Sequence, residues 1–142
     1  MKSVLLPVDL SDRKLSQKAL DVAVQQARHH NAVLHVVSVM PDYGMSMVGS
    51  FFDRKHERAA LSAMGDALTS WVDEHVPEDI EVRPHVLHGS IYDEILRAAD
   101  KLEAGLIVIA AHRPELKDYL LGPNAARVVR HAHQSVYVVR ED

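Results

Sequence analysis

The chain has 142 residues, 47% of them hydrophobic and 25% charged, and it contains no cysteine. This composition excludes intrinsic disorder, collagen-like repeats, a disulfide scaffold and cysteine-ligated zinc, and the length suits one domain over residues 1–142. A formal net charge of −4 argues against general attraction to nucleic acid or anionic membranes.

Short apolar runs alternate along the chain with longer segments of helical period. In chain order we predict a strand at Val4–Val8, a helix with its apolar stripe at Leu15–Ala23 and Ser11 as N-cap, a strand at Val33–Val39, a helix over Ala60–Val72, a strand at Val82–His88, a helix over Ile91–Leu102, a strand at Leu106–Ala110, a helix over Ala125–Ala132 and a strand at Val136–Val139.

The strand–helix alternation predicts an α/β fold with an open, doubly wound, five-stranded parallel sheet. The near-continuous apolar strands are typical of strands that helices cover on both faces, whereas Pro84 indicates an edge strand at Val82–His88. Ligands bind such sheets beyond the carboxyl ends of the strands. This rule points to Asp9, Val39 and the segment Ala110–Arg113.

No targeting segment or membrane span is predicted. The apolar run at Val4–Val8 ends at Asp9 and is shorter than the roughly 7–15 apolar residues of a signal-peptide core. No run approaches the ~18 apolar residues of a membrane span. Since a cysteine-free chain is also compatible with a reducing compartment, we expect a cytoplasmic protein without membrane insertion or a nucleic-acid partner.

The common catalytic and metal motifs are not found. There is no phosphate-binding P-loop and no G-x-G-x-x-G turn, and Gly44–Gly49 is only a near miss to the serine-hydrolase elbow. His85 and His88 are predicted to face opposite sides of one strand, which does not suit a metal site. The segment Pro41–Phe52 is long enough for a lid or contact surface, or it is a simple linker.

Two segments are candidates for one ligand site. Asp9 directly follows a buried strand, where its carboxylate either accepts hydrogen bonds from a ribose or caps the following turn. The segment Ala111–Gly122 leads into a helix that we expect to have Gly122 as N-cap and Pro123 as its first residue. The amides of Asn124 and Ala125 would then attract an anion, and Arg113 either adds a phosphate contact or is solvated.

Several motifs together resemble the universal stress protein family, in particular its small bacterial subgroup with a His-Arg-Pro loop. They are Leu5–Asp9, Val36–Val39, Leu106–Pro114 followed by Leu120–Gly122, and Ala126–Ala132 leading into Ser135–Val139. The resemblance covers essentially the whole chain. It implies a Rossmann-like sheet of the adenine nucleotide alpha hydrolase-like type with strand order 3-2-1-4-5. It also implies a homodimer paired through Ser135–Arg140, and bound ATP or another adenine nucleotide accompanied by Mg²⁺.

By this resemblance, Asp9 and the backbone of Val39 hold the ribose and adenine, while the turn after the fourth strand and the residues from Gly122 onward hold phosphates. The expected nucleotide-binding residues are Pro7, Val8, Asp9, Val39, Ile109, Ala110, His112, Arg113, Gly122, Pro123, Asn124 and Ala125.

The sequence departs from the family's nucleotide motif, which runs Gly, two residues, Gly, nine residues, Gly and then Ser or Thr. Ala110 and Arg113 replace the first two glycines, only eight residues separate Arg113 from Gly122, and Pro123 replaces the Ser or Thr. Proline lacks both an N–H and a hydroxyl, so two phosphate donors disappear. At about 1.5–3 kcal/mol each, their loss weakens triphosphate binding by roughly a hundred- to ten-thousandfold unless Arg113 or Asn124 compensates.

We therefore expect a stress-response regulatory protein that binds an adenine nucleotide and acts through an unidentified protein partner. The alternative is a nucleotide-free homodimeric interaction module, because of Pro123. An enzyme on the same fold would need a glycine-rich loop after the first strand, and Leu10–Asp12 offers none. We expect no enzyme activity beyond slow ATP hydrolysis.

Overall fold

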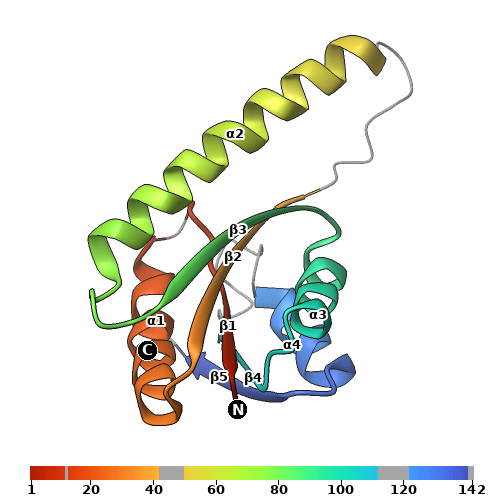
Figure 1. Cartoon of the computed structure of the whole chain (residues 1–142). Coiled ribbons are helices and arrows are strands. Elements are labelled where there is room, and N and C mark those ends of the chain that lie inside the picture. The colour runs from red at the N-terminus through yellow and green to blue at the C-terminus, as the bar shows by residue number, and fades with distance from the viewer. Residues whose placement is uncertain (12, 42–49, 112–121, 141–142) are drawn as a thin grey trace.

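The structure is a computed structural model that describes residues 1–11, 13–41, 50–111 and 122–140 (Figure 1). Strands and helices alternate along the described chain. The elements are β1 (Ser3–Pro7), α1 (Arg13–His30), β2 (Val33–Pro41), α2 (Ser50–His75), β3 (Val82–Gly89), α3 (Ile91–Lys101), β4 (Leu106–Ala111), α4 (Gly122–His131) and β5 (Ser135–Arg140).

The strands form one parallel sheet in the order β3-β2-β1-β4-β5. The predicted fold class and strand order are therefore confirmed. β3 lies at an edge of the sheet, as Pro84 indicated, and Pro84 itself is exposed. The carboxyl end of β1 lies beside Val37 of β2, and β2 continues from there to Pro41.

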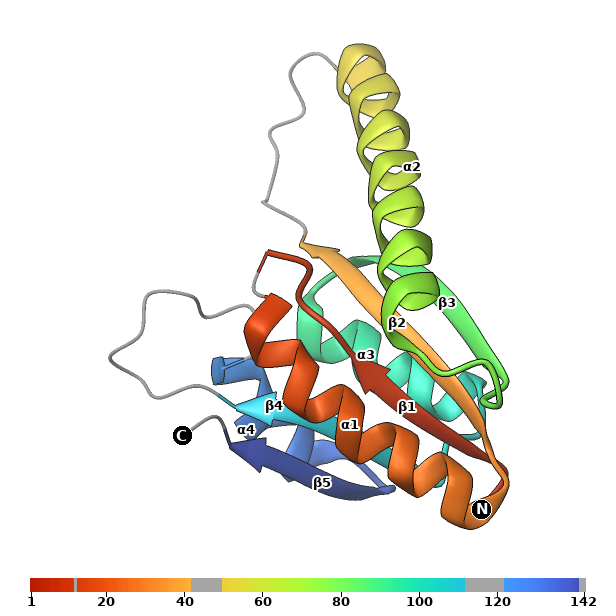
Figure 2. The ribbon, with the colours of Figure 1, turned by 90° about the vertical axis from the view of Figure 1, so that its left-hand side faces the viewer.

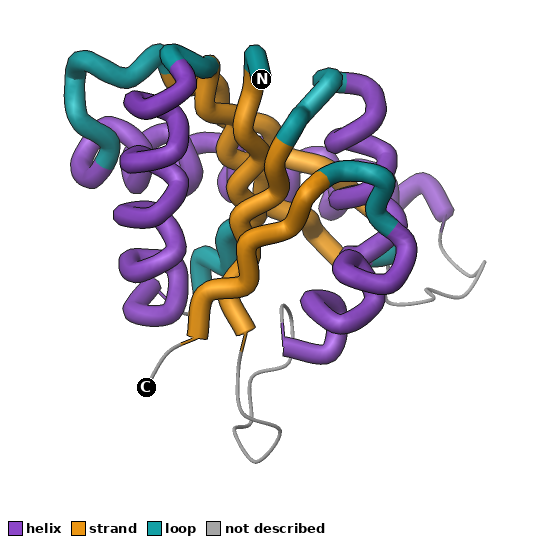
Figure 3. Tube along the Cα trace, turned by 90° about the horizontal axis from the view of Figure 1, so that it is seen from below, coloured by secondary structure: helices purple, strands orange, loops and turns teal. Residues whose placement is uncertain are grey.

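Helices cover both faces of the sheet (Figure 3). On one face, Leu6 and Val36 of the sheet pack with Leu68 of α2 in a cluster that also includes α1. On the other face, Val37 packs with Ile95 of α3 in a cluster that also includes α4. Neighbouring residues of β2 therefore enter different cores, as the period of two in a strand requires.

The starts of three helices differ from the sequence predictions. The first helix begins at Arg13, and the Ser11 hydroxyl bonds Asp9 rather than capping the helix. α2 begins at Ser50, so the Pro41–Phe52 connection is shorter than expected and residues 42–49 lie outside the described chain. α4 begins at Gly122, the predicted N-cap, and so one residue before the predicted first helical residue Pro123, a shift within the usual uncertainty of helix ends.

α2 is the longest helix of the described chain, with 26 residues, and its first turns extend beyond the sheet (Figures 1 and 2). Its later turns pack on the sheet through Leu68, Trp71 and Val72, which are all buried. Neither this helix nor any other in the described chain has an apolar segment that would span a bilayer.

Candidate functional site

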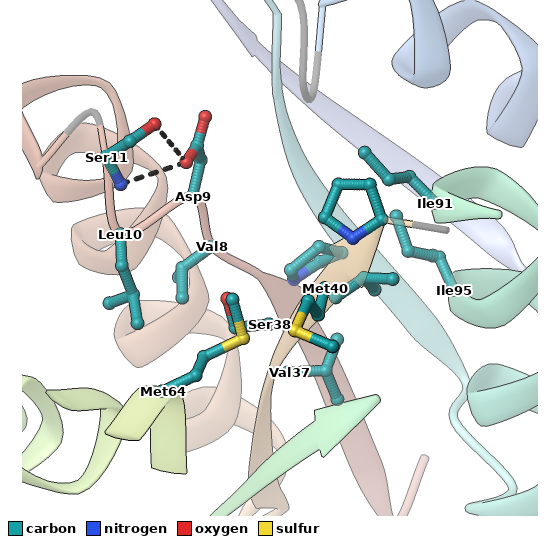
Figure 4. Close-up of a pocket in the computed structure, with 13 residues that line it drawn as sticks. Val8, Asp9, Leu10, Ser11, Val37, Ser38, Met40, Met64, Ile91 and Ile95 are labelled. Atoms are coloured by element: carbon teal, nitrogen blue, oxygen red, sulfur yellow. Dashed lines mark hydrogen bonds between the residues drawn. The ribbon is translucent and has the colours of Figure 1, made fainter. Parts of the chain in front are cut away.

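A cavity of about 220 Å³ lies at the carboxyl ends of β1 and β2 (Figure 4). It forms where β1 stops and the chain turns away toward α1, while β2 continues for several residues. Its walls come from the β1–α1 turn, the end of β2, α2 and the start of α3. The lining residues are Pro7, Val8, Asp9, Leu10, Ser11, Val37, Ser38, Val39, Met40, Pro41, Met64, Ile91 and Ile95.

Asp9 is held in place by the turn that follows β1. Its Oδ1 accepts hydrogen bonds from the backbone N–H of Ser11 at 2.9 Å and from the Ser11 hydroxyl at 2.6 Å. The backbone N–H of Asp9 in turn donates to the Ser16 hydroxyl in α1 at 3.3 Å. Asp9 is thus 6% exposed and caps its own turn while it lines the cavity. The sequence analysis left two roles open for the Asp9 carboxylate, ribose binding and capping of the following turn. The structure shows that it caps the turn.

The backbone of Val39 faces the space beyond the end of β1. The N–H of Val8 donates to the carbonyl of Val37 at 2.8 Å, so Val37 directs its backbone groups toward β1. Alternate residues of a parallel strand direct these groups to the same neighbour. Val39 therefore turns its N–H and C=O in the same direction, at a level where β1 has already ended. This gives the cavity one backbone donor and one backbone acceptor.

The remaining walls of the cavity are mainly apolar. Met40 lines it from the end of β2, Met64 from the middle of α2, and Ile91 and Ile95 from α3 (Figure 4). Ser38 interrupts this apolar lining with a hydroxyl and is 3% exposed. A cavity with apolar walls and a few polar groups suits a flat organic ligand. Its volume lies below the ~300–1,000 Å³ of most small-molecule sites, so it would enclose part of a nucleotide rather than all of one.

The predicted site residues divide into three groups. Pro7, Val8, Asp9 and Val39 line the cavity. His112 and Arg113, which were predicted to contact phosphates, lie outside the described residues. The remaining predicted residues, which do not line the cavity in the described chain, are Ile109 and Ala110, buried in β4, and Gly122, Pro123, Asn124 and Ala125 in the first turn of α4.

The first turn of α4 contacts α3. The Asn124 Oδ1 accepts a hydrogen bond from the backbone N–H of Tyr92 at 3.1 Å, and Ala125 is buried in the core between the sheet and these helices. Pro123 is exposed. This bond uses the acceptor oxygen of Asn124, whereas the sequence analysis considered Asn124 as a donor to phosphate.

The sequence did not indicate Ser38, Met64 or Ile91 as cavity residues. Ser38 lies inside an apolar run, and Met64 and Ile91 belong to apolar stripes that predicted ordinary core packing. They meet only because the sheet order brings α2 and α3 to the same end of β2. Of these residues, Ser38 alone could have been noticed in the sequence, because a polar side chain interrupts the apolar pattern of a buried strand.

Titratable groups are few around the cavity. Asp9 is the only acidic side chain among the described lining residues. Mg²⁺ commonly binds one or two carboxylates together with substrate phosphates and water. Asp9 alone could therefore supply one protein ligand, and the nucleotide itself would supply the others. No group of three His, Asp or Glu side chains able to hold a metal ion occurs within the described ranges.

A histidine pair lies elsewhere on the sheet. His35 Nδ1 and His85 Nε2 are 2.9 Å apart, on neighbouring strands and on the face that α3 covers. Burial lowers the pKa of both imidazoles, and the nearby Arg83 lowers each further. His88 faces the other side and contacts Glu57 of α2 at 3.1 Å. The prediction that His85 and His88 face opposite sides of the sheet is therefore confirmed.

Comparison with known proteins gives consistent similarities over the whole chain. The family model described as the Universal stress protein family matches residues 1–140. Universal stress protein G of Shigella flexneri is 31% identical over 141 residues, which cover 98% of this chain and 99% of that protein.

Two solved structures share the fold. The universal stress protein of Archaeoglobus fulgidus in complex with dAMP has a TM-score of 0.62 at 22% identity, covering 97% of each chain. A universal stress protein in complex with cAMP has a TM-score of 0.62 at 22% identity, covering 98% of this chain and 96% of that chain.

Proposed function

The chain belongs to the universal stress protein family, and from that premise we propose that it is a cytoplasmic stress-response regulator that binds an adenine nucleotide, ATP or AMP. The cavity at the ends of β1 and β2 would take the adenosine, with the phosphates toward the start of α4. Binding would change how the protein contacts a partner protein.

The geometry beyond the end of β1 carries this proposal. Asp9 brings a carboxylate to the cavity, which suits the hydroxyls of a ribose. Val39 turns one backbone donor and one backbone acceptor toward the same space, which suits the edge of a base. The apolar walls suit the faces of that base. The adenine nucleotides dAMP and cAMP in two structures of the same fold add support from relatives.

Equilibrium binding of AMP and ATP, measured by calorimetry, tests the proposal. Asp9→Asn retains an oxygen that can accept the Ser11 bonds but removes the charge, so it isolates the ligand role of the carboxylate. We expect Asp9→Asn to weaken AMP binding by about tenfold, the scale of one charge-assisted hydrogen bond. The matched control Ser11→Ala removes one bond within the turn and leaves the carboxylate. Absence of wild-type binding at millimolar nucleotide rejects the proposal.

A second candidate function is a nucleotide-free interaction module of the same fold. One feature of α4 favours it: Pro123 in the first turn has neither an N–H nor a hydroxyl to donate to a phosphate. To separate the two functions, the protein is purified from cells and denatured, and the released small molecules are identified by mass spectrometry. An adenine nucleotide at a stoichiometry near one per chain would reject the nucleotide-free alternative.

We also propose that the protein is a homodimer paired through β5. β5 is an edge strand without proline, and Tyr137 on it is 45% exposed. Such an edge leaves backbone groups available to a second strand, and a two-fold axis satisfies both copies at once.

The opposite edge of the sheet, β3, is less suited to pairing with a second strand. The N–H of Leu34 donates to the carbonyl of Glu81, so the even-numbered residues of β3, including Pro84, direct their backbone groups outward. Pro84 removes a donor from that outer edge.

We expect binding rather than efficient turnover. Asp9 is the only titratable side chain among the described residues of the cavity wall, and its Oδ1 accepts two hydrogen bonds from Ser11. A general base for water attack needs an available proton acceptor near the reacting phosphate. Slow ATP hydrolysis in a bound state is compatible with this arrangement, and a rate far above background that one substitution abolishes would contradict the expectation.

A further inference from the structure

A second cavity, the α3–β3 pocket, lies between α3 and the edge strand β3. Its volume is about 490 Å³, within the ~300–1,000 Å³ of most small-molecule sites. It shares no lining residue with the cavity at the ends of β1 and β2. The residues of the described chain that line it are His85, Leu87, Glu94, Arg97, Ala98, Lys101 and Leu102.

The floor of the α3–β3 pocket is apolar. Leu87 and Leu102 are half-buried and pack against the core between the sheet and α3, and Ala98 is 6% exposed. β3 ends the sheet on this side, and His85 and Leu87 on it remain half-buried. A ligand can therefore enter from the edge of the sheet and cover apolar surface that the described chain leaves partly exposed.

One positive charge on the pocket wall has no partner within the described part of the chain. Arg97 and Glu94 neutralise each other, since Arg97 Nη1 lies 3.2 Å from Glu94 Oε2. Lys101 follows Arg97 by one turn on the same side of α3. The Lys101 ammonium forms neither an ion pair nor a hydrogen bond with another described residue. On a protein with a formal net charge of −4, this wall favours a ligand with one negative charge.

The direction of α3 brings Lys101 toward the histidine pair. The start of α3 lies at the end of β3, where a Cβ on Gly89 would be 3.1 Å from the Glu94 Cγ. Because β3 is followed by the parallel strand β4, α3 must return the chain to the beginning of the sheet. Its last turn, with Lys101, therefore lies toward His85, which precedes Gly89 on β3 by four residues.

His85 offers a hydrogen-bond donor at this end of the pocket. Its Nε2 lies 2.9 Å from the Nδ1 of His35, which is 7% exposed, so a single proton lies between the two nitrogens. Burial lowers the pKa of both imidazoles, so both are neutral near neutral pH. When the shared proton belongs to His35, neutral His85 carries its own proton on Nδ1 and can donate it to an anion.

We propose that the α3–β3 pocket binds a small organic monoanion, a carboxylate with an apolar chain. Its carboxylate meets the Lys101 ammonium and the His85 Nδ1–H. Its chain covers the floor formed by Leu87, Ala98 and Leu102. A cation and a directed donor at one end of an apolar pocket select a carboxylate over a neutral molecule of the same shape. The proposal is independent of nucleotide binding, because the two cavities have no lining residue in common.

Titration with octanoate and with octanamide, its uncharged counterpart, tests the proposal in amide NMR spectra. We expect wild type to bind octanoate at millimolar concentration and octanamide about three- to tenfold more weakly, because the amide loses the ion pair. In Lys101→Gln this preference should disappear. Lys55→Gln is the matched control, because Lys55 is exposed on α2, which covers the other face of the sheet. The amides that shift should be those of His85, Leu87, Ala98 and Lys101.

The imidazole nitrogens give a second readout that a loose surface contact would not change. Their ¹⁵N chemical shifts report which nitrogen carries the proton, and we expect octanoate to hold the proton on Nδ1 in both His35 and His85. Absence of octanoate binding at millimolar concentration, equal binding of the amide by wild type, or an undiminished preference for octanoate in Lys101→Gln overturns the proposal. Amide shifts confined to the ends of β1 and β2 would place octanoate in the other cavity and overturn it as well.

Discussion

The Asn124 Oδ1 accepts a hydrogen bond from the backbone N–H of Tyr92, 3.1 Å away, and this bond joins the first turn of α4 to the first turn of α3. Ser90, the N-cap residue of α3, makes no side-chain capping bond. A side chain from another helix therefore satisfies one of the free N–H groups at this helix start. The Arg127 guanidinium, 4.9 Å from the centre of the Tyr92 ring, adds a cation–π contact between the same helices. Ile91, next to Tyr92, lines the cavity, so the α4 start supports one of its walls.

Asn124→Ala is expected to destabilise the protein by about 0.5–2 kcal/mol, because the Tyr92 N–H loses its acceptor. The free energy of unfolding in urea measures this loss. Hydrogen exchange at the Tyr92 amide gives a local readout, which should accelerate in the variant. Asn124→Asp is the control, since it keeps an oxygen acceptor and its negative charge suits a helix N-terminus. Unchanged exchange at Tyr92 in Asn124→Ala would contradict the capping role.

The histidine pair predicts a pH dependence of stability. Burial lowers the pKa of His35 from its ordinary value of 6.5, and the charges of His85 and Arg83 lower it further, while Glu81 acts in the opposite direction. Burial and Arg83 lower the pKa of His85 likewise. The unfolded chain therefore binds more protons than the folded chain below pH 6.5. The free energy of unfolding should fall as the pH is lowered through 6.5 toward the folded-state pKa values.

Urea unfolding between pH 8 and pH 5 measures this dependence. His85→Gln replaces one imidazole by a neutral amide that can still bond His35, so the fall in stability should become smaller. His30→Gln is the control, because His30 is exposed at the end of α1. Glu94, Arg97 and Lys101 of α3 line the same pocket as His85, and both variants retain them, so the comparison isolates the loss of one imidazole. Equal pH slopes in all three proteins would show that the pair does not titrate as described.

The strands of the sheet could be predicted from the sequence, because the pattern that identifies each strand lies within a few consecutive residues. Apolar runs such as Leu106–Ala110 and the proline at Pro84 predict buried and edge strands without any knowledge of distant contacts. The position of Asp9 could also be predicted, since a carboxylate directly after a buried strand lies at the carboxyl edge of the sheet.

The residues that line the cavity were harder to predict from the sequence, because they depend on how separate helices pack against one strand. Met64 lies 24 residues after Met40 in the sequence, and both stand in segments whose apolar pattern is that of ordinary packing. The pair of His35 and His85 was missed for a similar reason: His35 is one polar residue in an apolar run, and its partner follows 50 residues later. Cross-strand pairs of this kind require the register of β2 with β3, which the sequence pattern does not contain.

Tyr137→Glu is expected to convert the proposed dimer to a monomer at micromolar concentration. Tyr137 is 45% exposed on the edge strand β5, so the new charge would lie in the interface without disturbing the core. Sedimentation velocity measures the mass of wild type and variant. Thr69→Glu adds the same charge on the exposed face of α2 and should leave the mass unchanged. A wild-type monomer at this concentration would reject the dimer itself.

Two glycines are expected to respond to alanine with opposite signs. Gly89 ends β3 with φ of +145°, where a Cβ would lie 3.1 Å from the Glu94 Cγ of α3. Side chains rarely adopt this backbone conformation, so Gly89→Ala should destabilise the protein by about 1–3 kcal/mol. Gly65 lies inside α2, and a Cβ there would meet only the Val86 Cγ2 at 3.9 Å, an ordinary contact. Gly65→Ala should therefore stabilise the protein by about 0.5–1 kcal/mol, because alanine loses less conformational entropy in a helix. Urea unfolding of the two variants beside wild type measures both effects, and a stable Gly89→Ala protein would contradict the backbone geometry of the turn that leads from β3 into α3.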